Sequence, residues 1–203
     1  MSEIRARPIR VGVAIPAAGL GRRMGGAKKP YLLLGGEPVL LHALKRFLSR
    51  ADVTAIRIAV ASEDLAAPPA WLTALDARVQ LVAGGETRTD SVRAALRSLP
   101  AEVDVILVHD AARPLLTADV LDRCIAVASA GKGAVAGYPA VDTLKEVDGS
   151  GRVLSTPERA RFWHAQTPQA FPAALIRSAY ERSDAAAATD DSSLAELFLA
   201  DSE

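Results

Sequence analysis

Cysteine is almost absent from this sequence, since Cys124 is the one example among 203 residues. A disulfide framework within the chain is therefore excluded, and no cysteine-rich zinc pattern is present. Cys124 lies in an apolar run, so we expect a buried thiol with a structural role.

The sequence also lacks an excess of charge of either sign and any long apolar run. Its 24 basic and 24 acidic residues cancel, which argues against broad nucleic-acid binding, because that normally needs a basic surface. Residues 1–10 contain charges but no apolar signal-peptide core, and no later stretch approaches the length of a membrane span. We therefore expect no nucleic-acid partner, no membrane and a cytoplasmic location.

Apolar residues make up half of the sequence, which is enough for one substantial core. Short apolar runs at residues 11–15, 56–61, 79–82 and 103–108 alternate with amphipathic helical patterns, an order typical of α/β proteins. We predict a single domain over residues 1–203, with a Rossmann-like, mostly parallel sheet, helices on both faces and a protruding hairpin arm.

A glycine-rich, cationic loop follows the first apolar run. The run ends at Pro16, and residues 17–30 read Ala-Ala-Gly-Leu-Gly-Arg-Arg-Met-Gly-Gly-Ala-Lys-Lys-Pro. Glycines let backbone N–H groups approach a ligand closely, and amides aimed at one point form an anion site. Glycine and lysine are also common in ordinary surface loops. A nucleotide triphosphate is favoured here because four cations fall within eight residues, namely Arg22, Arg23, Lys28 and Lys29.

The spacing of this loop excludes two better-known phosphate loops. A dinucleotide fingerprint needs a small residue three positions after Gly21, where this chain has Met24. A P-loop needs a lysine followed by Ser or Thr, and neither lysine of the loop is followed by a hydroxyl residue. Neither hydride transfer nor P-loop ATPase chemistry is indicated.

Two further segments place polar residues after predicted strands. Residues 83–91 read Ala-Gly-Gly-Glu-Thr-Arg-Thr-Asp-Ser, and residues 109–114 read His-Asp-Ala-Ala-Arg-Pro. Ligands bind at the carboxyl ends of parallel strands, so we expect both segments beside the glycine loop. Asp110 could hold Mg²⁺, which binds through one or two carboxylates plus substrate phosphates, or could be a turn aspartate. Likewise, Thr89 or Ser91 could contact a ligand or cap the following helix.

Residues 141–155 are typical of a β-hairpin. Two polar strand-like stretches, 141–147 and 152–155, flank the turn Asp-Gly-Ser-Gly at 148–151. The polar character of both stretches predicts an arm that leaves the body of the protein, at about residues 141–160. Such an exposed arm needs a partner.

The motifs resemble those of the 2-C-methyl-D-erythritol 4-phosphate cytidylyltransferases, which join CTP to a methylerythritol phosphate in isoprenoid-precursor synthesis. The resemblance covers nearly all of residues 11–200, and its strongest parts are residues 16–24, 109–114 and 163–171. The family usually has Pro-Lys-Gln-Tyr where this chain has Lys-Lys-Pro-Tyr at 28–31. Lys29 stands two residues before the tyrosine and so matches the family's lysine, with Lys28 as the second candidate.

The resemblance implies roles in nucleotidyl transfer for the matching residues. Arg23 and Lys29 would stabilise charge on the transferring phosphate, and Asp110 would bind Mg²⁺. The nucleotide-binding residues would be Pro16, Ala17, Ala18, Gly19, Gly21, Gly85, Glu86, Ser91 and Ala111.

The resemblance also implies a homodimer in which the arm serves the acceptor site. Thr143 and Arg159 of one subunit would reach the methylerythritol phosphate in the other subunit's site. Thr167 would contact the substrate phosphate there, and Arg113 would orient the Asp110 loop or contact substrate. From the sequence alone, Arg113 and Arg159 could instead be ordinary ion-paired or solvated arginines.

The implied reaction needs no general base. A phosphate monoester with a second pKa of about 6 is mostly dianionic at pH 7, so it can attack the α-phosphorus of CTP directly. Pyrophosphate leaves, and the product is 4-diphosphocytidyl-2-C-methyl-D-erythritol.

Two alternatives remain open at this point. The first is a cytidylyltransferase for ribitol 5-phosphate or another sugar phosphate, because the glycine loop does not specify the acceptor. The second is a non-catalytic nucleotide-binding dimer module, because the family's Asn-x-Lys segment, with a further substrate-binding lysine, does not occur in these 203 residues.

Overall fold

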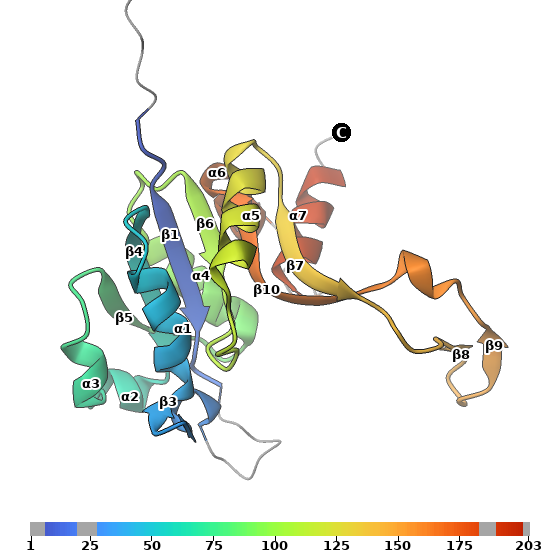
Figure 1. The fold of residues 1–203 in the computed structure, drawn as a ribbon, viewed down its shortest axis with the longest axis horizontal. Helices are drawn as coiled ribbons and strands as arrows, with labels where there is room; N and C mark the ends of the chain where they lie inside the picture. The colour runs from blue at the N-terminus through green and yellow to red at the C-terminus, as the bar shows by residue number, and fades with distance from the viewer. Residues whose placement is uncertain (1–6, 20–27, 183–189, 201–203) are drawn as a thin grey trace, which may run out of the picture.

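A computed structural model describes residues 7–19, 28–182 and 190–200 (Figure 1). Its centre is a six-stranded sheet with the order β5-β4-β1-β6-β10-β7. β1 pairs in parallel with β4 and β6, and β4 pairs in parallel with β5. β10 is antiparallel to both of its neighbours, so it alone runs against the other strands. The bounds are β1 (Val11–Pro16), β4 (Val53–Val60), β5 (Val79–Ala83), β6 (Val105–Val108), β7 (Ala134–Pro139) and β10 (Trp163–Pro172).

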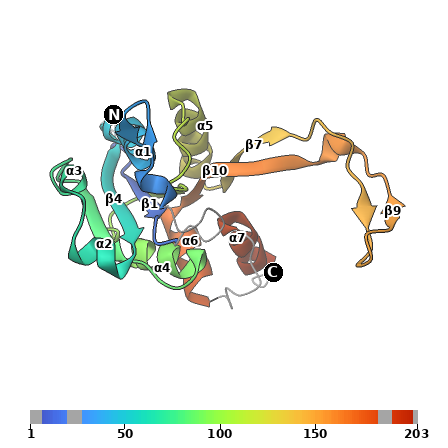
Figure 2. The ribbon, with the colours of Figure 1, turned by 90° about the horizontal axis from the view of Figure 1, so that it is seen from below.

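Helices cover both faces of the sheet, which confirms the predicted mostly parallel α/β fold (Figure 2). One face carries α1 (Val39–Leu48) and α5 (Ala118–Ser129). The other face carries α4 (Arg88–Ser98), α6 (Ala173–Arg182) and α7 (Asp191–Ala200). The smaller elements are α2 (Ser62–Ala66), α3 (Ala70–Thr73), 3-10 turns at Lys29–Tyr31 and Arg159–Arg161, and the paired short strands β2 (Leu33–Leu34) and β3 (Glu37–Pro38).

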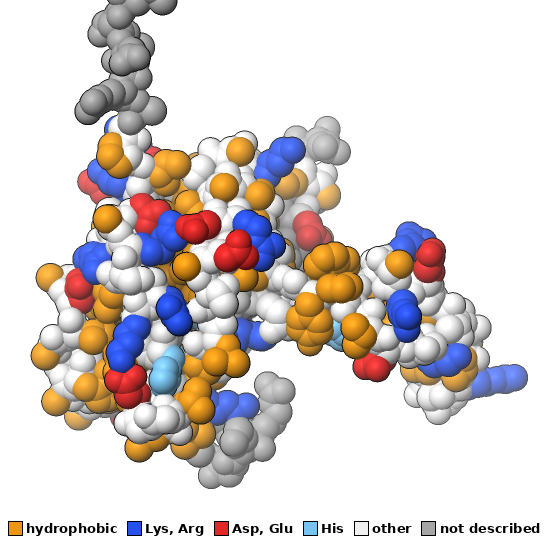
Figure 3. All heavy atoms as spheres, in the orientation of Figure 1, with side chains coloured by type: hydrophobic (Ala, Val, Ile, Leu, Met, Phe, Trp, Pro, Cys, Tyr) orange, Lys and Arg blue, Asp and Glu red, His pale blue; other side chains and the backbone are white. Residues whose placement is uncertain are grey.

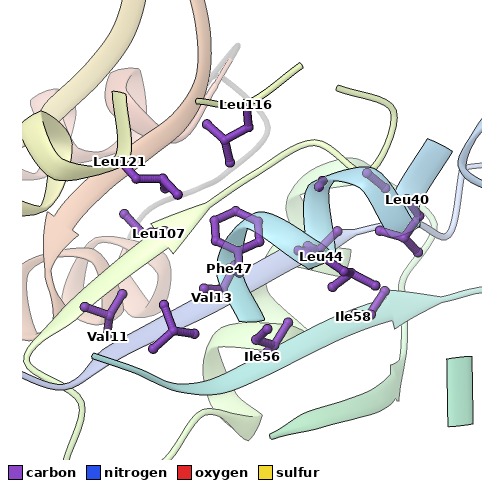
Figure 4. Packing of buried hydrophobic residues seen from close by; sticks show 14 of the residues in the cluster. Val11, Val13, Leu40, Leu44, Phe47, Ile56, Ile58, Leu107, Leu116 and Leu121 are labelled. Carbon is purple, nitrogen blue, oxygen red and sulfur yellow. The ribbon is translucent and has the colours of Figure 1, made fainter. Parts of the chain in front are cut away.

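The alternation of side chains along the strands divides the core into two layers. Val13 and Ile15 of β1 pack on the side of α1 and α5, whereas Ala14 packs on the side of α4 and α6. Phe47 of α1 and Leu107 of β6 belong to the first layer (Figure 4). Because β1 is buried on both faces, its sequence is continuously apolar, and the chain can present polar groups only where the strand ends.

Two helices begin at threonine caps that fix where the next residues point. At α4, the Thr87 hydroxyl accepts from the Asp90 N–H at 3.0 Å, and the Asp90 carboxylate accepts from the Thr87 N–H at 3.3 Å. This reciprocal pair satisfies free N–H groups of the first turn. The cap of α4 is therefore Thr87 rather than Thr89 or Ser91. Thr117 caps α5, where its side chain accepts from the Val120 N–H.

The arm leaves the body between β7 and β10, with the short hairpin strands β8 (Glu146–Val147) and β9 (Val153–Ser155) at its far end (Figure 1). Its predicted protruding shape is confirmed. Within the described residues, no helix is both long and apolar enough to cross a membrane. Cys124 is buried as expected, and this burial raises the pKa of its thiol.

Candidate functional site

A cleft of about 1080 Å³ opens at the carboxyl ends of β1, β4, β5 and β6. This volume lies at the upper end of the range for small-molecule sites, so it admits a nucleotide. Seven of the predicted site residues line it, from three separate segments: Pro16, Ala18, Gly19, Gly85, Glu86, Ser91 and Asp110. The fold therefore brings together six of the predicted nucleotide-binding residues and the metal-binding candidate, as expected for the carboxyl ends of parallel strands.

Close backbone approach explains the glycine pair after β5. A Cβ added at Gly84 would lie 2.4 Å from the Ala18 Cβ, and one added at Gly85 would lie 2.2 Å from the Asp90 Cβ. The Gly84 N–H donates to the Val60 carbonyl at 2.8 Å, which ties this loop to the end of β4. Any side chain at Gly84 would push the loop away from Ala18 and open the wall of the cleft.

The hydroxyl of Ser91 shapes the same loop. It donates to the Thr87 carbonyl at 3.0 Å and accepts from the Gly85 N–H at 3.2 Å, and Ser91 is 2% exposed. The hydroxyl is thus bonded to the backbone of Thr87 and Gly85, so Ser91 acts on the cleft by fixing the position of Gly85.

Two of the predicted nucleotide-binding residues support the wall of the cleft instead of lining it. Ala17 is buried, and its N–H donates to the Ala59 carbonyl at 2.7 Å. Ala111 is also buried. Gly21 and Arg23 lie outside the described residues.

Asp110 lies between two arginines. Its Oδ1 accepts from Arg88 Nε at 3.1 Å, and its Oδ2 accepts from Arg113 Nε at 3.0 Å. Burial alone would raise the pKa of Asp110, but the charge of Arg88 and hydrogen bonds from both arginines outweigh it and lower the pKa. Asp110 is therefore ionised at neutral pH.

Asp110 fits a metal that is shared with a bound nucleotide. Within the described part of the chain, no group of three or more His, Cys, Asp or Glu gathers to form a complete protein cage. Mg²⁺ does not need one, because it is often held by one or two carboxylates together with substrate phosphates. Each carboxylate oxygen has two lone-pair sites, so both oxygens of Asp110 can still accept a cation.

A buried histidine fixes the backbone under Asp110. His109 is 0% exposed, and its Nε2 lies 3.0 Å from the Arg113 carbonyl, which can only accept, so Nε2 carries the hydrogen. Burial lowers the pKa of His109 to about 4, so the ring is neutral. Its Nδ1 therefore accepts from the Thr167 hydroxyl at 3.0 Å, and this hydroxyl in turn accepts from the Asp110 N–H at 3.1 Å.

This arrangement gives Thr167 a role that the sequence does not reveal. Its single hydroxyl hydrogen is committed to His109, so Thr167 connects β10 to the loop that carries Asp110. Arg113 is brought to the same loop, where it binds Asp110 and the side-chain oxygen of Gln166.

The two lysines after the glycine loop have different surroundings. Lys28 Nζ lies 2.7 Å from both Asp64 and Glu63, and its hydrogen bond to Asp64 raises the pKa of the lysine. Lys29 is exposed, and no ion pair to it is present within the described residues. Of these two lysines, Lys29 is thus the one that remains available to a ligand.

The arm residues Thr143 and Arg159 do not line the cleft of their own chain. Both are exposed, and Arg159 Nη1 donates to the Val141 carbonyl at 2.8 Å. The arm extends away from the body in two views at right angles (Figures 1 and 2).

Sequence reasoning missed five residues that line the cleft: Ala61, Ser62, Gly84, Thr87 and Arg88. The first two follow β4, and the strand-end rule alone could have found them. Arg88 stands in the Gly-Gly-x-x-Arg-x-x-Ser segment, where a cap at Thr87 places it in the first turn of α4.

Comparisons with known proteins agree with the geometry. Residues 11–200 match the model of the family described as 2-C-methyl-D-erythritol 4-phosphate cytidylyltransferase. The protein of that name from Symbiobacterium thermophilum is 42% identical over 191 residues, which cover 93% of this chain and 80% of that protein. The one from Aeromonas hydrophila is 43% identical over 180 residues, covering 86% of this chain and 71% of that protein.

A solved structure has the same fold. The crystal structure of 4-diphosphocytidyl-2C-methyl-D-erythritol synthase from Anaerococcus prevotii superposes with a TM-score of 0.83 at 29% identity, covering 94% of this chain and 83% of that one. With the family match over nearly its whole length and a cleft formed by the matching motifs, this chain belongs to the 2-C-methyl-D-erythritol 4-phosphate cytidylyltransferase family of nucleotidyltransferases.

Proposed function

We propose that this protein transfers a cytidylyl group from CTP to 2-C-methyl-D-erythritol 4-phosphate, releasing pyrophosphate, in the non-mevalonate isoprenoid pathway. The observation that carries the proposal is the family match over residues 11–200, together with a cleft lined by the matching segments. The product is 4-diphosphocytidyl-2-C-methyl-D-erythritol. A cytoplasmic location and the lack of nucleic-acid partners stay predictions from composition.

We place the nucleotide against the ends of β1 and β5. Pro16, Ala18 and Gly19 supply one wall, while Gly85 and Glu86 supply the other. Glycine at these strand ends lets a bound anion approach the backbone closely. We assign the α-phosphate to Lys29 and, from the resemblance, to Arg23.

The chemistry requires positioning and charge compensation. The acceptor phosphate is already a dianion at neutral pH, so its oxygen attacks the α-phosphorus and the bond to pyrophosphate breaks without prior proton transfer. Arg23 and Lys29 stabilise the charge that develops on the transferring group. Two unit charges 4 Å apart gain about 1 kcal/mol in water and about 4 kcal/mol near a protein surface, so these cations act most strongly once the nucleotide excludes solvent.

A divalent cation, which we propose is Mg²⁺, would be held by Asp110 and the phosphates. When bound, it neutralises phosphate charge. The protein's own part is to keep Asp110 ionised and fixed, through Arg88, Arg113 and the hydrogen bond from the Asp110 N–H to Thr167.

We further propose a homodimer in which each arm completes the acceptor site of the other subunit through Thr143 and Arg159. Support comes from their exposure, from the finding that neither lines the cleft of its own chain, and from the protruding arm between β7 and β10 (Figure 1). Arg113, beside Asp110, would contact the acceptor from the body.

The proposal is tested by pyrophosphate release in a matrix of nucleotides and acceptors. CTP, ATP, GTP and UTP are each combined with methylerythritol phosphate and with ribitol 5-phosphate. Release with CTP and methylerythritol phosphate alone is expected. Release with ribitol 5-phosphate instead would reassign the acceptor, and calorimetric binding of CTP and Mg²⁺ without any release would indicate a non-catalytic module.

A further inference from the structure

A fully buried carboxylate lies behind the cleft. Asp191, the first residue of α7, is 0% exposed. Its Oδ2 accepts from Arg88 Nη2 at 2.8 Å, and its Oδ1 accepts from the Tyr180 hydroxyl. A buried charge is tolerated only when it is paired and hydrogen-bonded, and Asp191 meets both conditions. α7 therefore supplies a fixed negative charge behind the cleft, and Arg88 lies between this charge and the cleft.

Arg88 joins this buried charge to Asp110. One guanidinium group donates from Nε to Asp110 and from Nη2 to Asp191, while its side chain remains 36% exposed and lines the cleft. The guanidinium presents its donors in a rigid planar fork, so it holds the two carboxylates in fixed directions. Asp110 is accessible to a ligand in the cleft, whereas Asp191 is fully buried.

The charges in this cluster cancel. Asp110 and Asp191 carry two negative charges, and Arg88 and Arg113 carry two positive charges. Arg93 lies further back, 5.9 Å above the Tyr180 ring, and is paired with Asp90. A metal ion that binds Asp110 must therefore compete with Arg88 for the carboxylate. Asp191 weakens this competition, because the Arg88 guanidinium also donates to Asp191.

We propose that Arg88 and Asp191 are positioning residues that set how strongly Asp110 binds the divalent cation of the nucleotide complex. The inference rests on the proposed function and adds two residues that the sequence motifs did not assign. Removing the charge of Asp191 leaves Arg88 paired with Asp110 alone and makes the site more positive, so cation binding weakens. Removing the charge of Arg88 frees Asp110 and makes the site more negative, so cation binding strengthens.

The test measures Mn²⁺ binding to the whole chain in the presence of CTP, from the electron paramagnetic resonance signal of free Mn²⁺. The Asp191→Asn variant should raise the dissociation constant roughly fivefold, and Arg88→Gln should lower it by a similar factor, because one unit charge is changed at close range in each. The Mg²⁺ concentration that gives half-maximal pyrophosphate release should shift in the same two directions.

Asp119→Asn is the matched control, since Asp119 also lies in the first turn of a helix and is paired with an arginine, but on the exposed surface of α5. It should leave Mn²⁺ binding unchanged. The double variant Arg88→Gln/Asp191→Asn leaves neither charge buried alone, and it should bind Mn²⁺ more tightly than the wild type, because the charge removed beside Asp110 is the positive one. It therefore provides the measurement if a single variant does not fold.

Opposite shifts in the two single variants are a result that a purely structural role would not produce, because loss of folding would weaken binding in both. Shifts in the same direction, or no shift in either, would overturn the inference. A wild-type chain that binds Mn²⁺ with CTP but releases no pyrophosphate would instead overturn the proposed function, and the direction of the Mn²⁺ shifts would still decide the inference.

Discussion

The residues around the cleft are packed and hydrogen-bonded within their own chain, whereas the arm has little of its own chain to pack against. Ala17, Ser91 and His109 are buried around the cleft and bonded to neighbouring strands and loops. On the arm, Leu154 is 61% exposed, and Trp163 at its base is 65% exposed. Hydrophobic side chains gather where the arm joins the body (Figure 3). This difference teaches that one chain forms the cleft alone, while its arm exposes apolar side chains that its own body does not cover.

Replacing Lys29 should give the largest effect on turnover. We expect Lys29→Ala to lose roughly a hundred- to a thousandfold in turnover with the fold retained, because it removes a preorganised cation from the transferring phosphate. Pyrophosphate release and circular dichroism provide the measurement. Lys28→Ala is the control, since Lys28 is neutralised by Asp64 and Glu63, and it should lose far less. Equal losses in the two variants would contradict the assignment.

Replacing Gly84 should distort the cleft and leave the arm unchanged. Gly84→Ala places a Cβ 2.4 Å from the Ala18 Cβ, so the two walls must separate and CTP binding should fall at least about tenfold in calorimetry. Gly149→Ala on the arm is the matched control, since no atom lies within 4 Å of its added Cβ. Unchanged CTP affinity in Gly84→Ala would show that this contact does not shape the site.

His109 should make the folded body less stable as the pH falls. Its pKa in the folded protein is about 4, below the ordinary 6.5, so the unfolded chain binds a proton more readily. Stability from this group is complete above pH 6.5 and is lost as the pH falls toward 4, by about 2 kcal/mol between pH 7.5 and 5. Urea denaturation at several pH values should show this slope, and His109→Gln should remove it. A slope that persists in His109→Gln would mean that other groups cause the acid sensitivity.

The smallest effect on the body should come from a change at the far end of the arm. Leu154→Ser removes an apolar side chain that is exposed in the single chain, so the free energy of unfolding of the body should change by no more than about 0.5 kcal/mol, as for ordinary surface substitutions. Ultracentrifugation should nevertheless show weaker self-association. An unchanged association constant would remove the distal hairpin from the proposed interface.

The sequence predicted the elements that have a clear hydrophobic pattern or a clear terminus. Continuous apolar residues identified β1 and β6, and the polar segments after them were correctly placed at one edge of the sheet. β10 was not predicted, because residues 163–172 combine Gln, Thr and two prolines without alternation. Its position as an antiparallel strand between β6 and β7 depends on tertiary pairing.

Contacts between distant segments were equally beyond the sequence. The bond between Arg88 and Asp191 joins residues 103 positions apart, and the Thr167 hydroxyl reaches His109 over 58 positions. No local spacing encodes such pairs. The motifs thus identified which segments meet, while the structure identified which side chains hold the others in place.

The central claim is that each arm serves the cleft of the other subunit, and mixing two inactive variants tests it most directly. Lys29→Ala and Arg159→Ala chains are each assayed alone and then together after exchange of subunits. We predict that both are nearly inactive alone, and that the mixture regains up to about a quarter of wild-type activity, because half of the dimers are mixed and each contains one intact site. No recovery in a mixture shown to contain mixed dimers would contradict the account.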